Sequence, residues 1–179
     1  ELSSDERQSL AQYYPDLIIP HPTDSRKNIQ LSPVGAVAGV IVRTTIERGI
    51  WKAPAGVNAV IHGCRGLAAD LPDAEIEELN AIGVNSLKVI PGRGTVIWGG
   101  RTLDGSSRYF SDGKYLSIKR LVNFIQQSVE AGTGWTVFEP NSKGTWDALR
   151  LQISNFLDSL YRNGAFAGAA PHQSFYVRC

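Results

Sequence analysis

Two long stretches of the chain carry apolar residues at helical spacing. The first predicts a helix over 117–132 and the second a helix over 143–164, because apolar positions three and four apart share one face of a helix. The residues of the first stripe are Ile118, Leu121, Val122, Ile125 and Val129, and those of the second are Trp146, Leu149, Ile153, Phe156, Leu157 and Leu160. Glycines 132 and 164 suit the ends of the two helices.

A third helix is predicted to begin at Pro33, in the first turn, with Ser32 as its cap, and to stop at Gly49. Small side chains make one region of this helix thin, so we expect it to pack closely against a sheet or a second helix. These small residues are Gly35, Ala36, Ala38 and Gly39. A fourth helix is predicted between Pro72 and Gly83, with acidic residues in its first turns, where they complement the helix dipole.

Shorter apolar runs between these helices predict strands. They are 17–19, 60–68, 84–91, 95–100, 135–140 and 174–179, with a turn at 91–94 that joins two of them. Residues 101–115 are expected to form a polar loop, and the opening residues show a weak helical pattern. Strands separated by helices indicate an α/β fold in which a mixed β-sheet is packed with α-helices. We expect one compact domain over 1–179, with 1–31 as a lead-in segment from a preceding region.

Charge and composition narrow the classes of partner. The 179 residues include 18 basic and 17 acidic side chains, for a net charge of +1, and 42% are hydrophobic. A nearly neutral chain has no global field to hold it on DNA or on an anionic membrane. No apolar run or opening segment has the pattern of a membrane span or signal peptide. We therefore expect neither nucleic-acid nor membrane partners.

The cysteines and the two ends of the sequence lead to two further expectations. Cys64 and Cys179 are too few for a disulfide framework and suit a reducing compartment, which favours synthesis in the cytoplasm. The sequence contains no Met and stops directly after a strand-like run. We expect it to be a piece of a longer protein.

Candidate chemistry is sparse. His62 and Cys64 form an H-x-C pair, and His172 lies seven residues before Cys179, but zinc sites usually require a paired motif that is missing here. The glycine-rich turn around Arg93 offers backbone amides to an anion, although a strand follows it where a phosphate loop opens into a helix. No nucleophile-elbow motif is present. An enzyme is not expected, and no cofactor is predicted. The alternative is a small metal- or anion-binding enzyme domain that uses His62 and Cys64 or the Arg93 loop.

Surface contacts are the other candidates. Basic residues lie on or near the outward faces of the two long helices, either as solvated surface or as contacts to a complementary partner. They are Lys119, Arg120, Lys143 and Arg150. Trp51 and Trp98 lie in glycine-rich, exposed-looking settings, where each is either an interface anchor or a plug folded back on its own loop.

Four strings that cover nearly the whole chain from about Tyr13 onward resemble the C-terminal part of contractile phage tail sheath proteins. They are SPVGAVAGVIVRTTIERGIWKAPAG, LPDAEIEELNAIGVNSLKVIPGRGTVIWGGRTL, YLSIKRLVNFIQQSVEAGTGWTVFEPN and the closing run from Thr145 to FYVRC. The densest motifs are VAGV..RT..ERG.WKAPAG, PGRG..VWG.RTL and FEPN. The resemblance extends to R-type bacteriocin and phage-tail-like injection sheaths.

The resemblance implies a sheath core domain, with terminal arms missing, from a structural subunit that polymerises helically around an inner tube. In that family, six-start layers of subunits contract and drive the tube through a target envelope. Arms add strands to the sheets of neighbouring subunits, which is edge-strand augmentation. Implied partners are neighbouring sheath subunits in a six-fold helical homo-oligomer, the inner tail tube, and baseplate and terminator proteins. The tube-facing candidates are the four basic residues, with Trp51, Arg93 and Trp98 as loop or interface anchors. The implied location is a virion tail or a phage-tail-like particle, after assembly in the bacterial cytoplasm.

Overall fold

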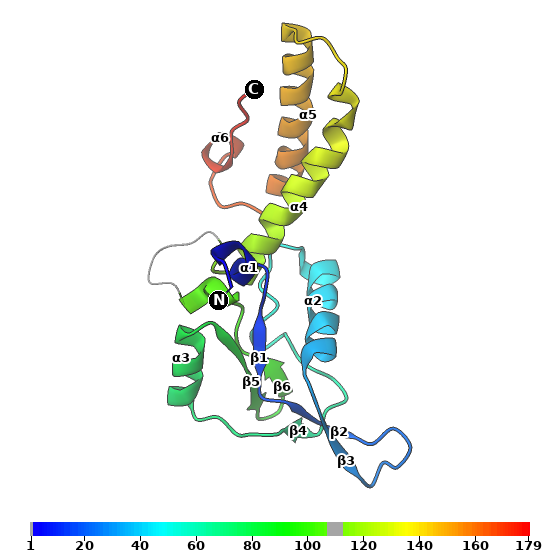
Figure 1. Ribbon diagram of the computed structural model, residues 1–179, viewed down its shortest axis with the longest axis vertical. Helices are drawn as coiled ribbons and strands as arrows, with labels where there is room; N and C mark the ends of the chain where they lie inside the picture. Colours follow the sequence, from blue (N-terminus) through cyan, green and yellow to red (C-terminus); the bar gives the residue numbers. More distant parts are fainter. Residues whose placement is uncertain (1, 107–112) are drawn as a thin grey trace. The chain divides into compact units, whose positions relative to one another are not determined.

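The chain forms two compact units of α-helices and small mixed sheets (Figure 1). The computed structural model describes residues 2–106 and 113–179. Unit 1 is Glu1–Leu121 and unit 2 is Val122–Cys179. The predicted α/β class is confirmed. The sequence analysis expected one sheath core domain over 1–179. The division into two compact units does not decide that assignment, which stays a prediction.

Unit 1 contains all of the β-structure found among the described residues. Its elements are α1 (Ser4–Gln8), β1 (Gln12–Tyr14), β2 (Leu17–Pro20), β3 (Asn28–Leu31), α2 (Val34–Arg48), β4 (Gly66–Leu67), α3 (Asp73–Ala81), β5 (Val84–Ile90), β6 (Gly94–Ile97) and the 3₁₀ helix η1 (Leu103–Ser106). Helix α4 (Leu116–Thr133) begins in unit 1 and continues into unit 2. The remaining elements of unit 2 are η2 (Gly134–Thr136), α5 (Lys143–Arg162) and α6 (Pro171–Ser174).

Two three-stranded sheets organise unit 1. In the first, of order β1-β5-β6, β1 runs parallel to β5, and β5 pairs antiparallel with β6 through Leu87 and Ile97. In the second, of order β3-β2-β4, all pairs are antiparallel. The sequence predicted β2, β5 and β6 but missed β1 and β3. Each of those is three or four residues long and is fixed by its pairing partner more than by its own pattern.

Helices α2 and α3 cover opposite faces of the first sheet, as Figure 1 shows. Alternation along β5 explains the arrangement, because successive side chains of a strand point to opposite faces. Leu87 is fully buried in the cluster that holds Val37 and Val40 of α2. The next residue, Lys88, points the other way and pairs with Asp73 of α3. One strand therefore separates the α2 face from the α3 face.

The buried amide of Asn85 connects three segments of unit 1. Its Nδ2 donates to the carbonyl oxygens of Gln12, at 3.1 Å, and Arg101, at 2.7 Å. Its Oδ1 accepts from the Arg101 backbone N–H at 2.7 Å. The Asn85 side chain thus satisfies backbone groups that the short β1 and the segment after β6 leave without strand partners.

Helix α2 stops at Gly49, as predicted, and this glycine adopts a φ of 88°. One other expectation for α2 is wrong. Pro33, rather than Ser32, is the N-cap residue, and it makes no side-chain cap bond. The side of α2 that carries Gly35 and Gly39 is open, since a Cβ at either glycine would meet no atom within 4 Å. The helix packs against the first sheet, as expected, but it does so through Val37 and Val40, with Ala36 beside them, and not through the two glycines.

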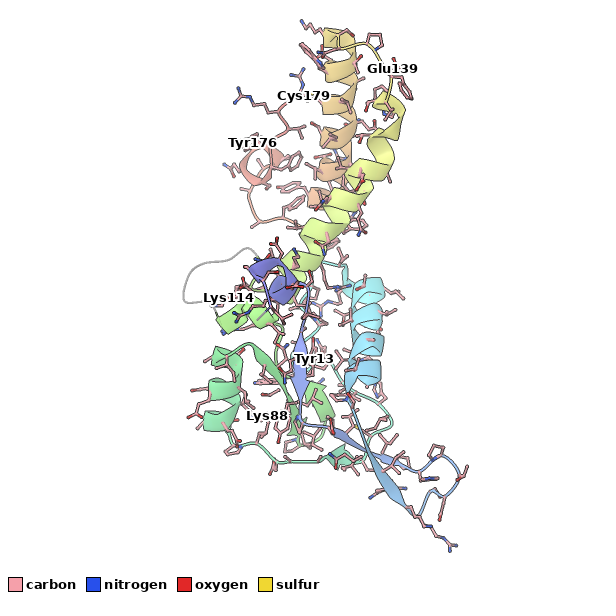
Figure 2. All side chains as sticks on the ribbon, in the orientation of Figure 1. Tyr13, Lys88, Lys114, Glu139, Tyr176 and Cys179 are labelled. Carbon is pink, nitrogen blue, oxygen red and sulfur yellow. The ribbon has the colours of Figure 1, made fainter. Side chains whose placement is uncertain are left out.

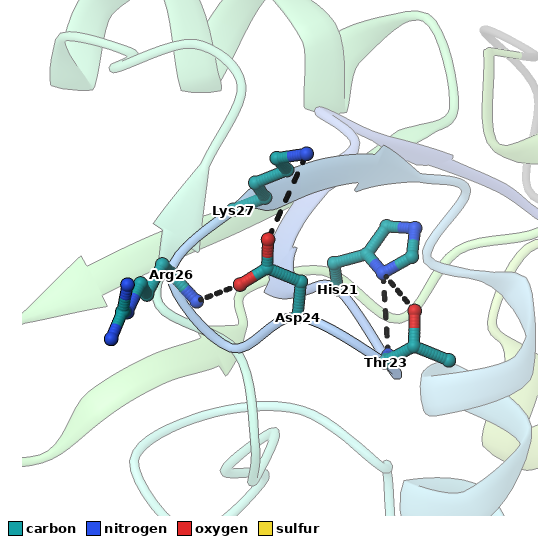
Figure 3. Close-up of polar contacts among 5 residues, drawn as sticks. All are labelled: His21, Thr23, Asp24, Arg26 and Lys27. Carbon is teal, nitrogen blue, oxygen red and sulfur yellow. Dashed lines mark hydrogen bonds and ion pairs between the residues drawn. The ribbon is translucent and has the colours of Figure 1, made fainter.

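The turn between β2 and β3 is held by local polar contacts (Figure 3). His21 Nδ1 accepts from the Thr23 backbone N–H at 3.3 Å. Asp24 accepts from the Arg26 backbone N–H at 3.1 Å, and its carboxylate lies 3.7 Å from Lys27 Nζ. Because aspartate side chains bond to backbone groups two residues on, they favour tight turns of this kind.

Unit 2 is a helical hairpin built from α5 and the greater part of α4, followed by the short α6. The rings of Phe124 and Phe156 lie 6.1 Å apart between the two helices. Gln152 accepts from Trp135 Nε1 and donates to the Gly132 carbonyl oxygen, both at 2.8 Å. Both long helices were predicted, and Val129, Ile153 and Phe156 of their apolar stripes line one small cavity between them. In the described residues, no helix is both long and apolar enough to cross a membrane.

Three predicted strands are wrong in whole or in part. Residues 135–140 form η2 and a turn, and 174–179 hold the end of α6 followed by irregular chain. Within 60–68, strand β4 covers two residues, and Val60 makes a bridge to Val96. Phe138, expected in a buried strand, is fully exposed with a φ of 74°. In the described chain, no strand of unit 2 is available to pair with residues 135–140 or 174–179. Of the predicted loop 101–115, residues 107–112 lie outside the described residues.

Candidate assembly surfaces

Arg120 is part of the packing of unit 1 rather than a free surface charge. Its Nη2 donates to the Thr45 hydroxyl of α2 at 2.7 Å. Burial lowers the pKa of Arg120, and the nearby Tyr13 hydroxyl partly opposes that shift. Burial also raises the pKa of Tyr13 to about 12, against the pull of the Arg120 charge. This geometry favours a structural role for Arg120. Lys119, its neighbour on α4, is half-buried.

Lys143 and Arg150 are exposed on α5, in unit 2. They are seven residues apart and therefore lie on the same side of the helix. Arg150 Nη2 donates to Asp147 at 2.7 Å. Lys143 is in the first turn, where a cation opposes the helix dipole, so helix stability does not account for it. Of the four predicted tube-facing residues, these two remain as an exposed pair, and their contact with a tube stays a prediction.

The two tryptophan candidates differ in setting. The Trp51 ring lies directly over Gly49, so closely that a Cβ at that glycine would collide with it. This position supports the loop-plug alternative. Trp98 is 41% exposed, and Lys88 Nζ lies 5.8 Å from the centroid of its ring. The Lys88 ammonium also pairs with Asp73, so the Trp98 ring lies near the α3 face. Lys88 is labelled in Figure 2. Trp98 therefore keeps an accessible aromatic surface that suits an interface anchor.

Arg93 is exposed in the turn between β5 and β6 and lines a groove of about 620 Å³. The other walls are the C-terminal half of α2 and the segment 52–62. Sequence reasoning identified Arg93 but missed the three other permanent cations that share this groove. They are Arg43, Arg48 and Lys52. The sequence shows that these three cations lie close together near the end of α2. It does not show that they lie near Arg93, because that proximity arises only when β6 pairs with the 59–61 segment.

The metal hypothesis gains no support. His62 is exposed, and the Cys64 thiol lies 3.5 Å from the Ile61 carbonyl oxygen, to which it donates. His172 and Cys179 belong to unit 2. Within the described ranges, no group of three or more His, Cys, Asp or Glu side chains is arranged to hold a metal ion.

Comparison with known proteins identifies the family. Residues 6–103, more than half of the chain, match the family described as phage tail sheath protein central domain. The chain belongs to the phage tail sheath family. The sequence analysis placed it in the C-terminal core of such proteins, and the match describes 6–103 as central.

Individual sheath relatives agree with this assignment. The tail sheath protein of Vibrio phage KVP40 is 28% identical over 127 residues, which cover 70% of this chain and 18% of that protein. A chain of the anti-feeding prophage baseplate is 33% identical with a TM-score of 0.84, over 96% of this chain and 44% of that chain. A chain of the anti-feeding prophage helical sheath in its contracted state is 35% identical with a TM-score of 0.76, over 88% and 42%. The chain thus spans less than half the length of these relatives.

Members of this sheath family are structural proteins, which agrees with the prediction that the chain is not an enzyme. The similarity covers both units, because the matched share of this chain exceeds either unit alone. Functional residues in a sheath protein are expected on its surfaces. The exposed α5 cations, Trp98 and the cationic groove at Arg93 are the candidates for such surfaces, and their roles stay predictions.

Proposed function

We propose that this chain is part of a contractile sheath subunit that polymerises helically around an inner tube and contracts to drive that tube through a target envelope. The observation that carries the proposal is the likeness to a helical sheath in its contracted state, at 35% identity and a TM-score of 0.76. The likeness to a chain of a six-fold symmetrised baseplate supports a six-fold particle that includes a baseplate. The proposed location is a virion tail or a phage-tail-like particle, assembled in the cytoplasm of the producing bacterium.

Neighbouring copies are proposed to join through added strands. The outer side of β3 has no strand partner among the described residues, and β1 is likewise an edge of its sheet. An unpaired edge presents a row of backbone N–H and C=O groups that an extended segment of another subunit can complete. These two edges are therefore the candidate acceptors for arms of neighbouring sheath subunits.

The inner tube is proposed to contact α5 through Lys143 and Arg150. Both side chains are exposed on one side of the helix, and their charge requires an acidic surface on the tube. Terminator proteins complete the proposed set of partners. Stored packing energy in the extended polymer, rather than a cofactor or hydrolysis, would drive contraction.

Electron microscopy of the full-length protein that contains this chain tests the proposal. Co-expression with the tube protein should give tubular or ring-stacked polymers. The double variant Lys143→Glu/Arg150→Glu should lose tube-dependent assembly while its circular dichroism spectrum and melting temperature stay near those of the wild type. Arg162→Glu is the control, because this residue lies on the same helix about 100° away from the Lys143 side. A protein that stays a compact monomer with and without the tube would refute the sheath function. Unchanged assembly of the double variant would refute only the tube-facing role.

A further inference from the structure

The groove beside the C-terminal half of α2 is strongly cationic. Arg43, Arg48, Lys52 and Arg93 line it together with the exposed His62, and Glu47 is the one acidic residue among its lining. The cations come from α2, from the segment that follows it and from the β5–β6 turn. Unit 1 therefore concentrates positive charge at one place, although the whole chain is nearly neutral.

The groove cations form no ion pair with an acid of the described residues, although Glu47 lies in the same lining. Arg43 Nη2 donates to the Val60 carbonyl oxygen at 2.5 Å, a neutral acceptor that holds the side chain in place. No ion pair within the described ranges involves any of the four cations. A concave surface with this charge attracts an anionic partner over roughly 10 Å at ordinary ionic strength.

Helix α3 carries the complementary charge. It contains four acidic residues and no basic one, and Ile76 is its buried residue. Asp73 pairs with Lys88. The remaining acids, Glu75, Glu77 and Glu78, are exposed and form no ion pair in the part of the chain that the structure describes. Helix α3 thus presents an uncompensated acidic surface.

The groove and α3 cannot meet within one copy. The groove lies on the α2 side, at the β6 edge, where Ala59 and Ile61 pack with the valines of α2. Helix α3 lies on the opposite face of the same sheet, beyond Lys88. A contact between two different surfaces on opposite sides of a subunit joins copies head to tail. Such a contact repeats without limit unless it closes into a ring, so it generates rings or helical filaments.

We propose that the cationic groove receives the acidic helix α3 of a neighbouring copy. This head-to-tail contact would add a charge interaction to the proposed strand exchange, and it rests on the proposed function. A second copy is favoured because the same chain carries the matching acidic surface, and because opposite placement is the arrangement that a helical polymer requires. Arg93 then acts as an interface residue whose place is fixed by the tight β5–β6 turn.

A charge-swap experiment on the full-length protein tests the contact. The groove variant is Lys52→Glu/Arg93→Glu, and the helix variant is Glu77→Lys/Glu78→Lys. Each should raise the protein concentration needed for sheath assembly by about tenfold or more, because like charges would then face one another. The control Arg26→Glu/Lys27→Glu has the same net charge as the groove variant but alters the β2–β3 turn instead. It should assemble at the wild-type concentration in sedimentation assays and electron micrographs.

Mixing the two charge-reversed variants is the decisive part of the experiment. The groove variant and the helix variant, mixed in equal amounts, should recover assembly, because each reversed surface finds its opposite on the other protein. A misfolded variant would not be rescued in this way. Wild-type assembly of both single variants, or failure of the mixture to recover, would overturn the proposed contact and leave the sheath function standing. The proposed contact would also be overturned if a short nucleic acid bound the groove and blocked assembly while the helix variant assembled like the wild type. If the wild-type protein formed no polymer, the sheath function itself would fail.

Discussion

Unit 1 and unit 2 differ in how much apolar surface they bury for themselves. Leu87, Val96 and Ile97 of unit 1 have no exposed surface, and its core extends over α2 and both sheets. In unit 2, Leu160 is the one buried hydrophobic residue among those described. Several large apolar side chains of unit 2 are exposed instead. They are Val122, Phe124, Trp135, Val137, Phe138, Trp146, Leu151 and Tyr176.

The difference follows from architecture. A sheet covered by helices encloses side chains on both faces, whereas a two-helix hairpin encloses one stripe per helix and leaves the rest open. Exposed apolar side chains gathered near the turn between α4 and α5 are typical of a surface that another chain covers. Unit 1 is therefore expected to fold independently, and unit 2 to gain much of its order from neighbours in an assembly.

The largest expected effect tests the core of unit 1. Leu87→Ala should lower the free energy of unfolding by about 2–5 kcal/mol, because it removes buried methyl groups and leaves a cavity. Leu151→Ala in unit 2 is the matched control, since Leu151 is 63% exposed, and it should change stability by less than about 0.5 kcal/mol. Urea unfolding of the two variants measures both values. Equal losses would contradict the contrast between the units.

The next largest loss of stability is expected when the buried side-chain amide of Asn85 is removed. Asn85→Ala should cost about 2–3 kcal/mol, because the Gln12 and Arg101 backbone groups would lose their partners inside the protein. Asn155→Ala, at an exposed position of α5, is the control and should be close to neutral. Chemical denaturation distinguishes the two. A near-neutral Asn85 variant would mean that water reaches those groups.

A pH titration tests the burial of Tyr13. Its pKa is raised from 10.0 to about 12 in the folded protein, so the unfolded chain loses the proton first as pH rises. Stability should therefore be constant up to about pH 9 and fall by about 2 kcal/mol between pH 10 and 12. Tyr13→Phe should make this part of the profile flatter. Tyr14→Phe removes the exposed neighbouring tyrosine and is the control. The same slope in wild type and Tyr13→Phe would exclude Tyr13 as its source.

These effects show what the sequence contained and what it lacked. The stripes of α4 and α5 and the apolar run at 84–91 were local patterns, and the structure confirms all three elements. The run at 135–140 reads as a strand by composition, yet it has no partner strand in unit 2 and remains exposed. The pattern of residues along one segment does not show whether a second strand lies beside it. For the same reason Arg93 was visible as a turn residue, but the groove that it shares with Lys52 depends on tertiary pairing.

The smallest effect concerns the start of α5. The Ser142 side chain accepts from the Thr145 backbone N–H at 3.4 Å, so Ser142→Ala should destabilise this end of the helix by about 1 kcal/mol. Hydrogen exchange at the first turn of α5 should become faster, while exchange in β5 stays unchanged. Ser154→Ala, inside the same helix, is the control without a cap. Faster exchange throughout unit 1 would contradict the independence of the two units.

Hydrogen exchange of the full-length protein, free and in polymerised sheath, tests the central claim most directly. Peptides of 134–146 and 151–162 should exchange rapidly in the free protein and become strongly protected on assembly. Peptides of β5 and β6 should be protected in both states, because unit 1 buries them already. That pattern would show that unit 2 presents surfaces made for contact between subunits. Equal exchange of unit 2 in the two states would contradict the account.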